Sequence, residues 1–67
     1  PGEGGAESRG SDALLQVRSV YWMGETYFGM KRYRDAREQF ERVLSLTDIE
    51  TLRVPAERMI RNCNKFL

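Results

Sequence analysis

The sequence predicts an all-α fold in which two antiparallel helices form a hairpin and a third helix caps it. Three successive segments carry apolar residues at steps of three and four, which is the periodicity of an amphipathic helix. No segment alternates apolar and polar residues with a period of two for long enough to predict a strand. The 67 residues allow one small domain, which we place at residues 12–67.

A disordered linker or tail is predicted over residues 1–11. Four of the six glycines lie in this stretch, and it contains no large apolar side chain. Ordering it would cost conformational entropy that no burial of apolar surface offsets.

The first helix is predicted over residues 12–29. Ser11 or Asp12 is suited to cap its N-terminus, where a carboxylate also favours the positive end of the helix dipole. Gly29 is expected to end the helix in the left-handed conformation that glycine adopts at helix C-termini. The positions that define the apolar stripe are Leu14, Val17, Val20, Tyr21, Gly24, Tyr27 and Phe28.

The second helix is predicted from Arg32 or Tyr33 to about Leu46. A link of about three residues to the first helix makes the two helices antiparallel neighbours. The apolar stripe of the second helix consists of Tyr33, Ala36, Phe40, Val43 and Leu44.

The third helix is predicted over residues 52–66, after a short turn at residues 48–51. Thr47 and Glu50 have the spacing of a capping box. Pro55 favours a start close to Thr51, because a proline in the first turn of a helix costs little. The apolar stripe comprises Leu52, Ala56, Met59, Ile60, Cys63 and either Phe66 or Leu67.

Four packing positions in the hairpin carry a more specific pattern. Small residues stand where two helices must approach closely, and rings fill the volume on either side. These positions are Gly24, Tyr27, Ala36 and Phe40. In their types and spacing they resemble the tetratricopeptide repeat, a helical hairpin of about 34 residues.

The resemblance covers residues 17–50, with Met23, Val20 and Asp48 in place of the family's leucine, tryptophan and late proline. It implies that the third helix is the capping helix that ends such arrays. It also implies a non-catalytic protein–protein interaction module, an adaptor or scaffold, that binds a partner peptide or helix on the inner face of the first helix. The residues of that face are Arg18, Tyr21, Trp22, Glu25 and Phe28.

Packing explains part of this face equally well. Tyr21 and Phe28 suit contact with a neighbouring helix as much as contact with a partner, so Trp22 is the better candidate for a partner contact. Some family members grip a C-terminal carboxylate with Lys and Asn. Tyr21 and Glu25 occupy those positions here, and Glu25 would repel a carboxylate. We therefore do not expect a clamp for chaperone tails.

Composition argues against an enzyme, a cofactor and a metal site. The chain has no histidine and one cysteine, so neither a Ser-His-Asp triad nor a site of thiolates and imidazoles for zinc can be assembled. We expect Cys63 to be a buried packing thiol in a reducing, intracellular compartment. No apolar run approaches the roughly 20 residues that span a bilayer.

A line of basic residues on the third helix suggests an alternative function. Arg58, Arg61 and Lys65 are spaced to share one face, which could make a weak contact with nucleic acid or anionic lipid. A solvated face is the simpler interpretation, because cations near the C-terminus of a helix are favoured by the negative end of its dipole. A further alternative is a structural unit that caps an array or forms a homodimer. The expected partner is another protein or further repeats of a parent chain.

Overall fold

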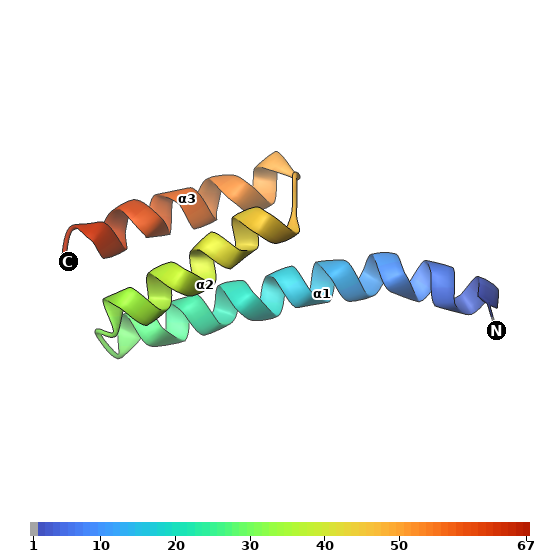
Figure 1. Ribbon diagram of the computed structural model, residues 1–67, viewed down its shortest axis with the longest axis horizontal. Helices are drawn as coiled ribbons and strands as arrows, with labels where there is room; N and C mark the ends of the chain where they lie inside the picture. Colours follow the sequence, from blue (N-terminus) through green and yellow to red (C-terminus); the bar gives the residue numbers. More distant parts are fainter. Residues whose placement is uncertain (1) are drawn as a thin grey trace.

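A computed structural model of the protein contains the helices α1 (Gly2–Gly29), α2 (Tyr33–Leu46) and α3 (Glu50–Asn64). The structure describes the side chains of residues 13–67, and the tail predicted at residues 1–11 lies outside this part. In Figure 1 each helix runs antiparallel to the next, so α3 runs in the same direction as α1. The described part of the chain has no strand, which confirms the predicted all-α hairpin with a third helix.

The core forms around α2, which packs against both α1 and α3. Of the stripe predicted for α2, Ala36, Phe40 and Val43 are fully buried. Tyr33 and Leu44 are partly buried and pack against this core. Both neighbouring helices contribute small or β-branched side chains. The buried core residues are Val17, Val20, Ala36, Phe40, Val43, Ala56 and Cys63.

Close contact between α1 and α2 depends on Gly24. A Cβ atom added to Gly24 would lie 2.8 Å from two atoms of the Phe40 ring, so this ring packs directly against the α1 backbone. Tyr21 meets the same ring edge to face, with the ring centres 5.2 Å apart. Tyr27 is half-buried beside them, and the Arg32 guanidinium lies 5.0 Å from the centre of its ring.

The end of α1 differs from the prediction at Gly29. No glycine in the described part of the chain has a positive φ, and Lys31 takes the left-handed conformation with φ 63°. Two hydrogen bonds explain the position: the Lys31 N–H donates to Phe28 O at 3.0 Å, and the Arg32 N–H donates to Tyr27 O at 2.9 Å. This pair of bonds is the Schellman motif, which places its left-handed residue two positions after Gly29.

The start of α3 also differs from the prediction. The helix begins at Glu50, two residues before the predicted start, and its N-cap residue Ile49 makes no side-chain capping bond. The prediction of a capping box formed by Thr47 and Glu50 is therefore wrong. The Thr47 hydroxyl accepts a hydrogen bond from the Ile49 N–H at 3.1 Å and shapes the turn. Pro55 lies inside the helix, where its missing N–H leaves the carbonyl of the exposed Thr51 without a helical partner.

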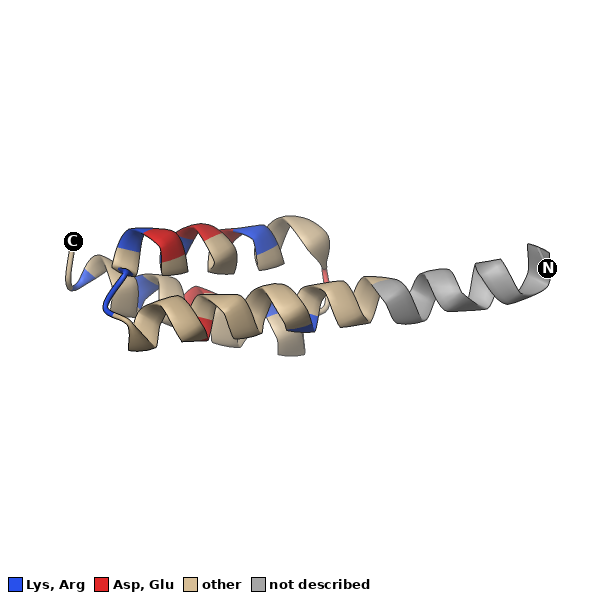
Figure 2. Cartoon of the chain, turned by 90° about the horizontal axis from the view of Figure 1, so that it is seen from below, with Lys and Arg blue, Asp and Glu red and all other residues tan. Residues whose placement is uncertain are grey.

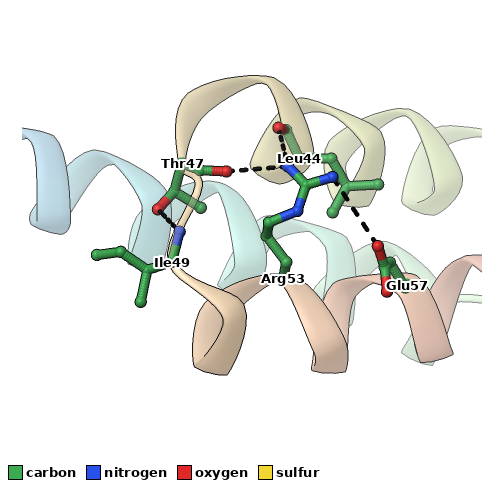
Figure 3. Close-up of polar contacts among 5 residues, drawn as sticks. All are labelled: Leu44, Thr47, Ile49, Arg53 and Glu57. Carbon is green, nitrogen blue, oxygen red and sulfur yellow. Dashed lines mark hydrogen bonds and ion pairs between the residues drawn. The ribbon is translucent and has the colours of Figure 1, made fainter.

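Arg53 joins α3 to the C-terminal end of α2 (Figure 3). Its Nη1 donates hydrogen bonds to Leu44 O at 2.6 Å and to Thr47 O at 3.0 Å. These carbonyls lie at the negative end of the α2 dipole, where a cation is favourable. Its Nη2 also lies 3.9 Å from the Glu57 carboxylate. Arg53 thus fixes the corner between α2 and α3.

We predict opposite effects for alanine at two glycines of α1. Gly24→Ala should lower the free energy of unfolding by about 1–3 kcal/mol, because the new methyl group meets the Phe40 ring. Gly29→Ala should raise it by about 0.5–1 kcal/mol, because nothing lies within 4 Å and alanine favours a helix. Urea unfolding followed by circular dichroism measures both, and equal effects would contradict the close approach.

We predict that Arg53→Ala lowers the free energy of unfolding by about 1–3 kcal/mol, because it removes hydrogen bonds from a charged donor to two carbonyls. Glu57→Ala is the matched control. It should change stability by about 0.5 kcal/mol or less, since that ion pair is long and partly exposed. Similar losses in the two variants, measured by thermal or urea unfolding, would show that the carbonyl bonds do not fix this corner.

Candidate functional site

The structure divides the five predicted partner-binding residues among different surfaces of α1. Arg18 and Tyr21 face a groove shared with α3, and the exposed Glu25 lies close enough to Tyr21 to act on it electrostatically. Trp22 lies on another side of the helix, and Phe28 packs in an aromatic cluster at the end of the hairpin. The five residues therefore do not form one continuous binding face.

The groove lies between α1 and α3 and forms a partly open cavity of about 260 Å³. Val17, Arg18 and Tyr21 line it from α1, and Leu52 and Pro55 line it from α3. Neither of the two α3 residues is among those that the sequence predicts for a partner site. Pro55 is suited to a groove because it presents a rigid apolar ring and no side-chain polar group.

Charges around the groove act on the Tyr21 phenol. Burial is the main cause that raises the pKa of Tyr21 above its ordinary value of 10.0, and Glu25 raises it further, whereas Arg58 lowers it. The phenol therefore stays protonated near neutral pH and can donate or accept a hydrogen bond. Arg18 and Arg58 are exposed, one on each helix of the groove. The site thus combines apolar walls, one phenol and two cations.

Phe28 packs within the chain. Its ring meets Tyr33 edge to face at 5.2 Å and Phe66 at 6.1 Å between ring centres. Tyr33 and Phe66 stack at 4.4 Å with their planes 12° apart. The three rings tie the ends of all three helices together, which favours the packing interpretation of Phe28 over a partner contact.

Trp22 has a different environment. Its side chain is 70% exposed, and together with Met23, Thr26 and Tyr27 it lines a shallow depression that no residue of α3 borders. It is therefore available to a partner, but to one approaching a different side of α1 from the groove. Tyr21 and Trp22 are neighbours in sequence, and a helical turn of about 100° per residue separates them.

The basic residues predicted on α3 are all exposed: Arg58, Arg61 and Lys65. Of these three residues, Arg58 lies near enough to the groove to lower the pKa of Tyr21 electrostatically. Figure 2 shows both signs of charge along α2, whereas the described part of α1 is mostly uncharged. Residues 13–29 contain only Arg18 and Glu25 as charged side chains.

In the part of the chain that the structure describes, no group of three or more His, Cys, Asp or Glu residues is placed to hold a metal ion. Among the same residues, no helix combines the length and the apolar character that crossing a membrane requires.

Comparison with protein-family models, with curated proteins and with solved structures found no match for this chain. The likeness to tetratricopeptide repeats therefore stays a prediction.

Cys63 is fully buried, and burial raises the pKa of its thiol above the ordinary value of 9.0, against a smaller opposing effect of Arg37. Folding therefore favours the neutral thiol. The stability that the folded state gains by burying the neutral Cys63 thiol is fully present below pH 9.0. It is lost as the pH rises through the raised pKa. We predict that the free energy of unfolding falls as the pH rises above 9.0 and falls less steeply in Cys63→Ala. Parallel pH profiles of the two proteins, measured by urea unfolding, would contradict this assignment.

Proposed function

We propose that the protein is a non-catalytic protein–protein interaction module. Its groove between α1 and α3 accepts a short segment of a partner that carries one bulky apolar side chain next to acidic residues. The observation that carries the proposal is the cavity lined by Arg18, Tyr21, Leu52 and Pro55, with the exposed Arg58 near enough to Tyr21 to act on its phenol.

The size of the cavity favours one anchoring side chain over a small-molecule ligand. At about 260 Å³ it is smaller than the roughly 300–1,000 Å³ of most ligand pockets. An apolar side chain of a peptide or helix would fill it and displace water from Leu52 and Pro55. Buried apolar area would then supply affinity, as in other complexes where an amphipathic segment enters a groove.

The charges favour an acidic partner segment. Arg18 lines the cavity from α1, and Arg58 of α3 lies near enough to Tyr21 to lower the pKa of its phenol. Glu25 is the one acidic residue among residues 13–29 of α1. A carboxylate beside the apolar anchor would pair with either arginine, and the partly buried Tyr21 phenol can add a hydrogen bond. The resemblance to tetratricopeptide repeats supports the same helix as the binding element.

The first test selects peptides from a random display library on the 67-residue protein. We predict that the selected peptides share a bulky apolar residue with Asp or Glu within a few positions of it. Arg58→Glu should weaken their binding at least tenfold, because it places a carboxylate beside the acidic residues. Isothermal titration with one selected peptide measures the loss.

Arg34→Glu is the matched control, since it makes the same charge change at an exposed position of α2 outside the groove. It should leave the affinity within about twofold of the original protein. Selected peptides without acidic residues, or equal losses in Arg58→Glu and Arg34→Glu, would contradict the groove as the binding site.

A further inference from the structure

One side of α1, together with Met30 directly after its end, carries large apolar side chains that no other helix covers. Trp22 is 70% exposed, Leu15 59%, Met30 53% and Met23 43%. Ser19 and Thr26 lie between them and are also exposed. We call this surface the outer face; it consists of Leu15, Ser19, Trp22, Met23, Thr26 and Met30.

The outer face is continuous and uncharged. Its members follow one another at spacings of one, three or four residues, so they form a single stripe about four turns long. Val17, Val20 and Gly24 are buried against the core on the other side of the helix. Exposed apolar patches of this kind mark interaction surfaces more often than chance exposure does.

The outer face has the same pattern of sizes in both directions along the helix. The point midway between Trp22 and Met23 is the centre of this symmetry. Reversing the direction of the helix about that point places Trp22 at the position of Met23 and Ser19 at the position of Thr26. Leu15 and Met30 exchange at the two ends. An antiparallel pair of identical helices related by a two-fold axis brings such positions opposite each other. Large residues would then meet large ones and small would meet small, with Trp22 against the methionine of the other copy.

The charges at the edge of the outer face fit the same axis. Arg18 and Glu25 lie on the edge nearest the groove, about 10 Å apart along the helix and therefore too distant to pair within one chain. In the antiparallel pair, Arg18 of one copy lies within about 3 Å, measured along the axis, of Glu25 of the other. The two-fold axis repeats this contact, so the dimer has two complementary ion pairs.

We propose that two copies of this chain associate through the outer faces of α1, antiparallel, with the two-fold axis between Trp22 and Met23. The outer face meets the cavity between α1 and α3 only at Arg18, and the association does not require the function proposed for that groove. One helix face per copy is smaller than the roughly 800 Å² per partner of a stable complex. The dimer is therefore weak, with a dissociation constant on the order of 100 μM.

The first experiment measures the mass of the 67-residue protein by sedimentation equilibrium from about 10 μM to about 1 mM. We expect the monomer at low concentration and a rise toward the dimer at high concentration. Trp22 is the chain's single tryptophan, so its fluorescence should shift to shorter wavelength over the same range. Trp22→Ala should remain monomeric at every concentration. A monomer throughout in the unaltered protein overturns the proposal.

The second experiment reverses the edge charges one at a time. Arg18→Glu places acidic residues opposite each other, Glu25→Arg places basic residues opposite each other, and each should weaken self-association about tenfold. Mixing the two variants should restore association, because every Arg and Glu then faces an opposite charge on the other copy. Failure of the mixture to associate overturns the antiparallel register.

Two variants separate this surface from the rest of the molecule. Arg34→Glu makes the same charge change at an exposed position of α2 that is not part of the outer face, and Arg58→Glu makes it on α3; both should self-associate like the unaltered protein. Circular dichroism confirms that each variant keeps its helices. If either of these variants loses association as strongly as Arg18→Glu does, the assignment to the outer face is overturned. If Arg58→Glu loses only peptide binding, the result concerns the groove and not the dimer.

Discussion

The approach of the Phe40 ring to the α1 backbone at Gly24 is the contact on which the rest of the structure depends. Because Gly24 has no side chain, α2 can lie close enough for one ring to touch both the backbone of α1 and the edge of Tyr21. The opposite side of α2 packs against α3, with Ala56 and Cys63 fully buried there. The distance from α1 to α2 therefore also sets how far α3 stands from α1, and with it the width of the groove.

The sequence predicted the helices well where periodicity alone determines them. The bounds of α2 and the burial of Ala36 and Phe40 follow from apolar spacing, because one central helix must bury a stripe against both neighbours. Backbone hydrogen bonding determined the errors. A left-handed Lys31 is unfavourable for its own side chain and is held by two bonds that span several residues. Arg53 reaches carbonyls six and nine residues away, which no short motif in the sequence reveals.

The candidate site was less predictable, because a helix surface faces several directions at once. Tyr21 and Trp22 are adjacent in sequence, yet one lies in a groove beside α3 and the other points to solvent. A prediction that places Tyr21 and Trp22 on one face is wrong, because α3 borders the surface of Tyr21 and does not border that of Trp22. Leu52 and Pro55 could not be assigned to the site for a related reason. Leu52 and Pro55 line the groove because α3 lies beside α1. That placement depends on packing between residues distant in sequence.

The two proposed surfaces meet at Arg18, and this shared residue couples them. Arg18 lines the groove and also lies at the edge of the outer face, so a pairing with Glu25 of a second copy would withdraw it from a partner bound in the groove. Arg58 stays beside the groove in either state. Coupling between two binding events is reciprocal, so an acidic partner that holds Arg18 would weaken self-association by the same factor as dimerisation weakens partner binding. Because this coupling passes through one exposed ion pair, partner binding and self-association would oppose each other only modestly.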